Sequence, residues 1–326
     1  MKVLVTGAGA LLGQGIIRSL LESSLAIDVI AADPSEHAAG LYWTPHRHLI
    51  PMATSPEYLE SIERLLAHER PDAVMVGTDV ELALFAAHRE RLEQRYATHI
   101  VVSDPRVVAI ADDKFETYRF LRDHGFPYPD SVLPEAQDDI DALVARVGFP
   151  LVVKPRVGAR SVGVGIVRDR TQLATALAGR AGLVVQECVA TDRDEFTAGV
   201  VCFDGRCDAS IVMRRDLRDG NTYRAFVDHY PALNETVRRM AEALRPHGPA
   251  NFQFRLDGDV AKVFEINGRF SGTTPLRMRA GFNEVEMVLR HLVLGESVRQ
   301  PDVVPMTILR HWTETIMPAE TGVPRS

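Results

Sequence analysis

Cysteine is scarce in this sequence, and it has neither a long apolar run nor an excess of basic charge. The three cysteines in 326 residues, Cys188, Cys202 and Cys207, are odd in number and form no C-x-x-C, which favours buried thiols over a disulfide framework. No apolar run approaches the roughly 18 residues that a membrane-spanning helix needs. Lys and Arg total 37 against 44 Asp and Glu, a formal net charge of −7, whereas a dedicated nucleic-acid binder needs a basic surface.

The composition that remains is typical of a globular chain with a large core. Hydrophobic residues make up 46% and charged residues 25%, and the length suggests about two or three domains. The N-terminus, Met1 to Gly7, has one positive charge and a short apolar run that glycines interrupt, so we interpret it as a first strand and not as a signal peptide. We therefore expect a cytoplasmic protein without a membrane or nucleic-acid partner.

Strands alternate with helices over the first 105 residues. This alternation predicts a parallel sheet with both faces covered by helices. The expected strands cover residues 3–5, 27–32, 73–76 and 99–102, and the expected helices follow Gly15, Pro56 and Val80.

A glycine pair after the first strand suggests a dinucleotide-binding loop. Gly7-x-Gly9 begins the Rossmann fingerprint, but Leu12 occupies the place of the third glycine, which comes one residue later as Gly13. Asp33 lies where such folds carry a ribose-binding acid. A tight strand-to-helix turn is the favoured interpretation, and an NAD(P)-dependent oxidoreductase is kept as an alternative.

The second half is richer in strands and contains a flexible glycine-rich segment. Helices are expected at residues 113–124, 138–147, 232–245 and 278–294, and strands at 151–154, 166–167, 183–186, 197–203, 206–212, 251–256 and 260–266. Lys154 ends one of these strands, and the loop from Gly158 to Gly165 follows it. Its glycines let backbone N–H groups turn toward an anion, and Arg160 and Ser161 add donors. A plain glycine-rich hairpin is the alternative.

A possible metal site lies on the last strand pair. Glu265 and Asn267 are two residues apart, so they share one face of a strand, and a turn at Asp257-Gly258 would set Gln253 opposite them. One carboxylate and two amide oxygens suit Mg²⁺ beside substrate phosphates. The alternative is an exposed polar strand face. Arg269, just beyond, is a candidate for binding carboxylate or phosphate.

Taken in order, these segments resemble an ATP-grasp ligase of the carbamoyl-phosphate-synthase-like and biotin-carboxylase-like branch. The resemblance rests on Asp113-Lys114-Phe115, Gly148 to Pro155, Gly158 to Gly165, Val185-Gln186-Glu187, Asn251-Phe252-Gln253 and Glu265 to Arg269. It implies an α/β and α+β protein with an N-terminal Rossmann-like pre-ATP-grasp domain and a two-lobed ATP-grasp fold. The implied domains are residues 1–107, a small lobe at 108–186 with the lid, and a large lobe at 187–326 with the metal-binding strands and the C-terminal tail.

The resemblance also implies roles for individual residues. Lys114 and Lys154 would hold the ATP phosphates, and the lid would close over them. The hinge residues Glu187 to Val189 would meet the adenine edge, Glu195 would accept the ribose hydroxyls, and Arg269 would face the transferred phosphoryl group. Arg269 and Lys154 are the implied catalytic residues. The nucleotide-binding set is Lys114, Lys154, Gly158, Arg160, Ser161, Gly163, Gln186, Glu187, Cys188, Val189 and Glu195, and the metal set is Gln253, Glu265 and Asn267.

The implied activity is ATP-dependent ligation of a small carboxylate to an amine through an acylphosphate, with release of ADP and phosphate. One or two Mg²⁺ ions, replaceable by Mn²⁺, would assist, and a homodimer is common in the family. A non-catalytic ATP-binding module is the alternative. The sequence departs from the family pattern at Arg160, Gln253 and Gly268, where glycine, an acid and proline are usual. Residues expected to select the substrate are Arg214, Arg215, Tyr223, Arg224, His229 and 271–279.

Overall fold

The computed structural model describes residues 1–158, 161–189 and 195–317, and its first unit is a parallel α/β domain. The sheet order is β3-β2-β1-β4-β5 and every neighbouring pair is parallel, which confirms the predicted sheet. Strand β3 was not predicted from the sequence. The elements are β1 (Lys2–Val5), α1 (Leu11–Leu21), β2 (Asp28–Asp33), the 3₁₀ turn η1 (Ala39–Tyr42), β3 (His46–Leu49), α2 (Tyr58–Glu69), β4 (Ala73–Met75), α3 (Asp79–Tyr96) and β5 (His99–Val101).

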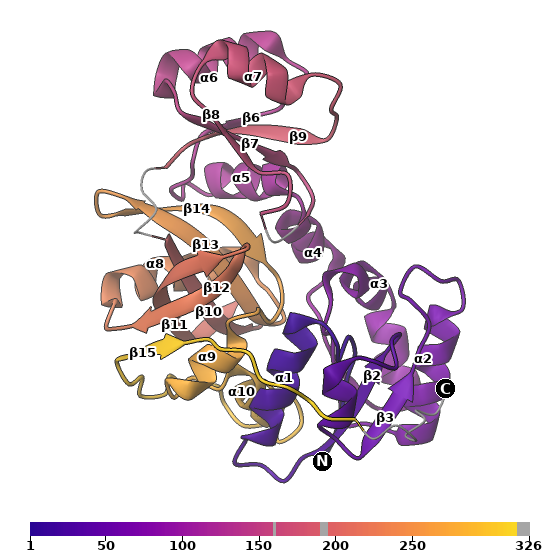
Figure 1. The fold of residues 1–326 in the computed structure, drawn as a ribbon. Helices are drawn as coiled ribbons and strands as arrows, with labels where there is room; N and C mark the ends of the chain where they lie inside the picture. Colours follow the sequence, from indigo (N-terminus) through magenta and orange to yellow (C-terminus); the bar gives the residue numbers. More distant parts are fainter. Residues whose placement is uncertain (159–160, 190–194, 318–326) are drawn as a thin grey trace.

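The second sheet is small, antiparallel and set at one end of the molecule (Figure 1). Its order is β6-β9-β7-β8, and β7 pairs with β8 across the glycine-rich loop, as expected. This part of the chain contains α4 (Pro105–Asp112), α5 (Lys114–Asp123), β6 (Ser131–Val132), α6 (Gln137–Val147), β7 (Leu151–Pro155), β8 (Gly165–Val167), α7 (Arg170–Leu177) and β9 (Leu183–Glu187).

The third sheet is larger, also antiparallel, and has the order β14-β13-β10-β11-β12-β15. Its elements are β10 (Glu195–Phe203), β11 (Arg206–Arg218), β12 (Asn221–Val227), α8 (Pro231–Leu244), β13 (Gly248–Asp257), β14 (Val260–Asn267), α9 (Thr274–Arg279), α10 (Glu284–Leu292) and β15 (Met306–Leu309). The prediction of a single helix at 278–294 is wrong, because two shorter helices, α9 and α10, occupy this part of the chain. Gly281, at a φ of +95°, separates α9 from α10, and the Asn283 side chain caps α10 by accepting from the Glu286 amide.

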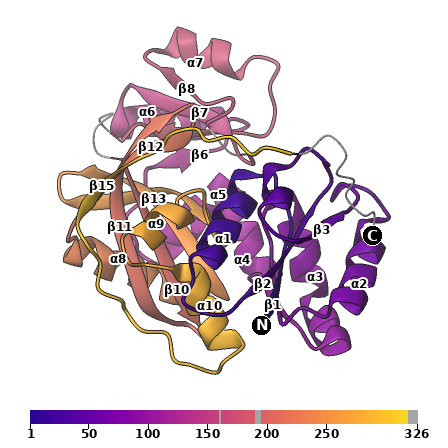
Figure 2. The same cartoon turned by 60° about the horizontal axis from the view of Figure 1, so that its bottom comes forward.

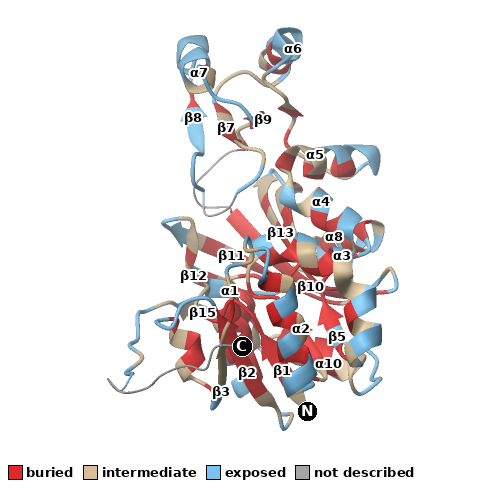
Figure 3. Cartoon of the chain, turned by 90° about the vertical axis from the view of Figure 1, so that its right-hand side faces the viewer, coloured by how far each residue is buried: buried red, intermediate tan, exposed pale blue. Residues whose placement is uncertain are grey.

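Two cores sandwich the large sheet. All nine residues of β10 are buried, and Figure 3 shows the red interior continuing from this sheet into the first domain. On one face Val201 and Phe203 share a core with Val3 and Ile16 of the first domain. On the other face the core includes Phe120 of α5 and Val107 of α4. Residues 105–123 therefore pack on the large sheet, and the boundaries 1–107, 108–186 and 187–326 stay a prediction.

The glycine loop after β1 makes a tight turn stabilised by its own hydrogen bonds. Gly7 has a φ of +59°, and a Cβ on Gly13 would lie 2.1 Å from the Gly7 carbonyl oxygen, so the turn requires glycine. The Asp33 carboxylate accepts from the Gly9 amide (2.7 Å) and the Ser35 amide (2.9 Å). The acid that a ribose would need is thus engaged by the backbone of the turn, which supports the tight-turn interpretation.

The C-terminal segment connects the large sheet to the first domain. Strand β15 pairs with β12, and the chain then runs back toward the parallel sheet, where the Trp43 indole donates to Thr315 Oγ1 at 2.8 Å. Figures 1 and 2 show this crossing in yellow. No element was predicted for the residues after Pro301 from their sequence pattern. Among the residues described, no helix is both long enough and apolar enough to cross a membrane.

Candidate nucleotide and substrate site

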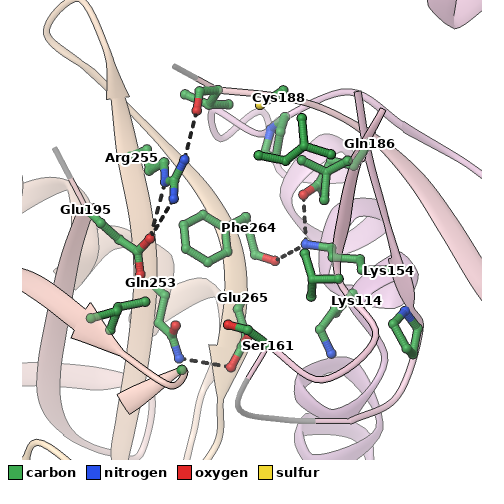
Figure 4. Close-up of a pocket in the computed structure, with 18 of the residues that line it drawn as sticks. Lys114, Lys154, Ser161, Gln186, Cys188, Glu195, Gln253, Arg255, Phe264 and Glu265 are labelled. Atoms are coloured by element: carbon green, nitrogen blue, oxygen red, sulfur yellow. Dashed lines mark hydrogen bonds and ion pairs between the residues drawn. The ribbon is translucent and has the colours of Figure 1, made fainter. Parts of the chain in front are cut away.

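A cavity of about 230 Å³ lies between the small and large sheets (Figure 4). The strands β7, β9, β13 and β14 and the glycine-rich loop form its walls. Of the predicted nucleotide-binding residues, the lining includes Lys114, Lys154, Gly158, Ser161, Gln186, Glu187, Cys188, Val189 and Glu195. Gly163 is not in the lining, and Arg160 lies outside the described residues.

Lys154 is a buried amine in the wall of this cavity. Its Nζ donates to Gln186 Oε1 at 2.7 Å and to the Phe264 carbonyl at 3.4 Å, and only 5% of the residue is exposed. Burial lowers the pKa of Lys154 from 10.5 to about 7, and Glu265 opposes this shift only in part. The amine therefore loses its proton more easily than an exposed lysine, and an approaching anion would favour its charged form.

Lys114 is the first residue of α5, and the loop holds its amine in place. Asp113 caps the helix by accepting from the amides of Phe115 and Glu116. The same carboxylate binds Arg156 at 2.6 Å. Lys114 Nζ donates to the carbonyls of Gly158 (2.7 Å) and Arg156 (3.4 Å), so the amine sits at the base of the glycine-rich loop.

Glu195 is already engaged by two arginines that the sequence reasoning did not connect to it. Its Oε1 accepts from Arg215 Nη2 at 2.7 Å, and its Oε2 accepts from Arg255 Nη2 at 2.9 Å. The partners come from β11 and β13, which flank β10, and Glu195 pairs in register with Arg255. A ribose hydroxyl would have to share this carboxylate with both guanidinium groups, so the predicted ribose contact stays a prediction.

The hinge residue Glu187 has a structural partner as well. Lys262 Nζ lies 2.6 Å from Glu187 Oε1, and the Asp130 amide donates to Glu187 Oε2 at 3.0 Å. The carboxylate thus ties β9 of the small sheet to β14 of the large sheet. Glu187, Cys188 and Val189, at the end of β9 and just beyond it, all line the cavity.

The predicted metal residues do share one face. Gln253 pairs in register with Glu265, as the hairpin predicted, and Asn251 pairs with Asn267. Gln253 Nε2 and Asn267 Nδ2 both donate to Glu265 Oε1, at 2.9 Å and 3.2 Å. The amide oxygens accept instead from Arg215 (2.5 Å) and Arg269 (2.9 Å).

This donor set fits Mg²⁺ only together with other oxygen ligands. Within the described ranges no three His, Cys, Asp or Glu side chains cluster as metal ligands do. Glu265 is the one carboxylate of the proposed set, and the two amides would have to rotate to present oxygen. Mg²⁺ is often held by one or two carboxylates plus phosphate oxygens and water, so the set suits an ion that arrives with a nucleotide.

A second cavity of about 870 Å³ adjoins the first. The two share six lining residues: Lys114, Gly158, Arg215, Gly220, Gln253 and Glu265. The first domain supplies one wall, from residues 9–12 at the start of α1 and residues 77–80, 82 and 83 around the start of α3. The other wall includes Asn267, residues 268, 269 and 271–273 after β14, and Arg310 after β15. Residues from both ends of the chain thus meet at one site, which local sequence patterns could not show.

Arg269 faces the second cavity and not the first. Its guanidinium pairs with Asp79, donates to the Phe270 carbonyl at 2.8 Å, and leaves 9% of the residue exposed. Among the residues expected to select the substrate, Arg215 lines both cavities, and Ser271, Gly272 and Thr273 line the second. Tyr223, Arg224 and His229 line neither of these two cavities.

Three family models match the chain in succession. The PylC-like N-terminal domain matches residues 3–100, the RimK-like ATP-grasp domain matches 111–235, and the model described as ATP-grasp in the biosynthetic pathway with Ter operon matches 182–315. The carbamoyl phosphate synthase large chain of Methanosarcina mazei is 23% identical over 329 aligned residues, which cover 91% of this chain. The alignment covers only 30% of that relative's length.

Solved structures show the same fold. N5-carboxyaminoimidazole synthetase from Staphylococcus aureus, complexed with ADP, has a TM-score of 0.74 at 16% identity, covering 94% of this chain and 81% of that one. The biotin carboxylase domain dimer of the Hydrogenobacter thermophilus 2-oxoglutarate carboxylase has a TM-score of 0.71 at 18% identity, with coverage of 93% and 72%. The two ATP-grasp models together run from residue 111 to residue 315, and the chain therefore belongs to the ATP-grasp superfamily, with a PylC-like domain in front of its ATP-grasp domain.

Proposed function

We propose that this chain is an ADP-forming ligase that activates a small carboxylate with ATP and joins it to an amine. The observation that carries the proposal is the meeting of two cavities at Glu265 and Gln253. The first cavity has the two lysines and the glycine-rich loop that a nucleotide requires. The second is larger, opens beside Arg269, and has room for the two other reactants.

The reaction would proceed in two displacements. A carboxylate oxygen forms a bond to the γ-phosphorus of ATP while the bond from that phosphorus to the β,γ-bridging oxygen breaks, which gives an acylphosphate and ADP. The amine nitrogen then attacks the acyl carbon, phosphate leaves, and the nitrogen loses a proton. Catalysis of phosphoryl transfer depends mostly on positioning and charge neutralisation, which cavities lined with cationic side chains supply.

The residues divide these tasks. Lys114 and Lys154 would bind the phosphates, and the loop that begins at Gly158 would exclude water from the acylphosphate. Gln253, Glu265 and Asn267 would hold one or two Mg²⁺ ions, which neutralise phosphate charge; Mn²⁺ would serve in their place. Asp79 fixes the Arg269 guanidinium, which would orient the carboxylate or the phosphoryl group beside Asn267.

The proposal extends to the oligomeric state of the protein. The biotin carboxylase domain named above is a dimer, and a homodimer is proposed for this chain by analogy with it. The partners in the reaction would be small molecules, a carboxylate and an amine.

The nucleotide products test the reaction type. Incubation with Mg²⁺-ATP and pooled amino acids and small carboxylic acids is expected to release ADP and phosphate with at least one pool. Hydroxylamine added in place of the amine should trap the acylphosphate as a hydroxamate. AMP and pyrophosphate as products would contradict the proposal. Tight ATP binding without turnover in any pool would favour the non-catalytic module.

Lys154 gives a pH-dependent prediction for nucleotide binding. Its pKa is about 7 in the free protein, and nearby phosphates raise it by favouring the charged amine. Binding should therefore take up a proton, and affinity for Mg²⁺-ADP should be full below pH 7 and fall between pH 7 and pH 9, by at most about tenfold per pH unit. Calorimetry at pH 8 in buffers of different ionisation enthalpy measures the uptake.

The matched variant is Lys154→Met, which keeps an unbranched side chain one atom shorter than that of lysine and cannot take up a proton. It should bind Mg²⁺-ADP more weakly, with an affinity that changes little over the same pH range. Proton uptake equal to that of the wild type in this variant would show that another group is responsible.

A further inference from the structure

Arg310 follows β15 and reaches the second cavity from the C-terminal segment. Its backbone amide donates to the Tyr223 carbonyl at 3.0 Å, which continues the pairing of β15 with β12. Its guanidinium donates from Nη1 to the Thr222 carbonyl (3.2 Å) and from Nη2 to the Gly272 carbonyl. The side chain therefore bridges β12 and the loop before α9, and it lines the cavity between them.

The guanidinium has no acidic partner within residues 1–158, 161–189 and 195–317. The two hydrogen bonds named above go to neutral carbonyl groups, which fix its plane but cannot balance its charge. Burial lowers the pKa of Arg310 to about 10, and the charge of another cation, Arg18, acts in the same direction. By contrast, Arg215 and Arg269 in the same cavity are each paired with a carboxylate.

A partly buried arginine without a counter-ion is a costly feature of a cavity wall. Two of its five N–H donors are used, and the remaining ones have the planar arrangement that matches a carboxylate or a phosphate. Helix α1, whose first residues line the same cavity, has no acidic residue in its first turn that would compete for the guanidinium. An anionic group in the cavity would supply the missing counter-charge.

We propose that Arg310 binds an anionic oxygen group, a carboxylate or a phosphate, on the substrate that occupies the second cavity. This inference rests on the proposed function, because it concerns the reactant that meets the activated carboxylate, and it adds that this second reactant carries an anionic group of its own. The group is distinct from the reacting carboxylate, since Arg310 lines only the second cavity whereas Glu265 and Gln253 of the proposed metal set line the junction with the first.

The test is direct binding of small anions at constant ionic strength. The wild-type chain is titrated with succinate, L-glutamate, O-phospho-L-serine and inorganic phosphate. It is also titrated with succinamide, L-glutamine and L-serine, in which both carboxylates of succinate, or the side-chain carboxylate or phosphate of the amino acids, are replaced by neutral groups. Calorimetry and the melting temperature serve as readouts. At least one anion should bind saturably, and its analogue without that charged group should bind more weakly. Preference for the carboxylates or for the phosphates identifies the source of the charge.

Arg310→Gln should weaken binding of that anion about 10- to 100-fold, because a hydrogen bond to a charged group is lost together with the charge. Arg310→Lys should recover part of the affinity. The control is Arg218→Gln on β11, an exposed arginine that lines neither of the two cavities and should leave binding unchanged. Unaltered Mg²⁺-ADP binding by Arg310→Gln shows that the variant is folded.

The two proposals fail separately. Absence of Mg²⁺-ADP binding to the wild-type chain overturns the proposed function, whatever the anions do. Absence of binding by every anion in the panel, or equal binding by wild type and Arg310→Gln, overturns the role of Arg310 while leaving the ligase proposal in place.

Discussion

Replacing Glu265 with glutamine is expected to lower ATP turnover about 100- to 1000-fold while the protein stays folded. Glu265 is the one carboxylate in the proposed metal set, and it accepts a hydrogen bond from each of the two side-chain amides in that set. A bound metal ion contributes several kcal/mol of charge stabilisation in such reactions, and each 1.36 kcal/mol is a factor of ten in rate. Steady-state ADP formation with the identified substrate pool measures the loss, and urea unfolding measures the stability.

The matched control lies in the same hairpin. Asp257→Asn removes an acid at the tip between β13 and β14, where the side chain is 62% exposed and pairs with Lys262. This variant should retain wild-type turnover. Near-normal turnover by Glu265→Gln, beside an unaffected control, would show that the metal assignment is wrong.

Replacing Glu284 with alanine is expected to cost about 3–5 kcal/mol of the free energy of unfolding. Glu284 and Arg277 form an ion pair in which the side chains are 0% and 1% exposed, and Arg277 also donates to Thr197 Oγ1 at 3.2 Å and to Asn251. Removing the acid leaves an uncompensated buried guanidinium, which is far more costly than losing an exposed pair. The total free energy of unfolding of a typical domain is only about 5–15 kcal/mol. Urea denaturation at pH 7 measures the change.

Two further variants separate charge burial from general damage to α10. The double variant Arg277→Met with Glu284→Leu removes both charges and should recover most of the lost stability. Glu296→Ala removes a half-exposed partner of Arg290 and should cost less than about 0.5 kcal/mol. A double variant as unstable as Glu284→Ala would show that packing, and not the unpaired charge, causes the effect.

Local sequence patterns were enough to predict how the site residues on the neighbouring strands β13 and β14 are placed relative to one another. The alternation of side chains put Glu265 and Asn267 on one face, and the turn at Asp257-Gly258 set Gln253 opposite, as the register confirms. Lys114 and Lys154 likewise follow from a helix start and a strand end. Each of these inferences needs only the geometry of one element or one hairpin.

Residues brought together by distant segments were not predictable in the same way. Arg255 is opposite Glu195 because β10 and β13 are neighbours in the sheet, although the two residues are 60 positions apart in the chain. Asp79 meets Arg269 through docking of the first domain on the large sheet. Arg310 follows a four-residue strand in a stretch whose pattern indicated nothing, and only its pairing with β12 fixes its place.

Because Arg310 and β15 come late in the chain, the residues that line the two cavities are completed at different times during protein synthesis. A chain emerging from the ribosome contains every lining residue of the first cavity once Glu265 is outside, but it lacks Arg310 and the strand that closes the edge at β12 until about forty-five residues later. All the residues proposed to bind the nucleotide are thus synthesised before Arg310, the residue proposed to bind the second reactant.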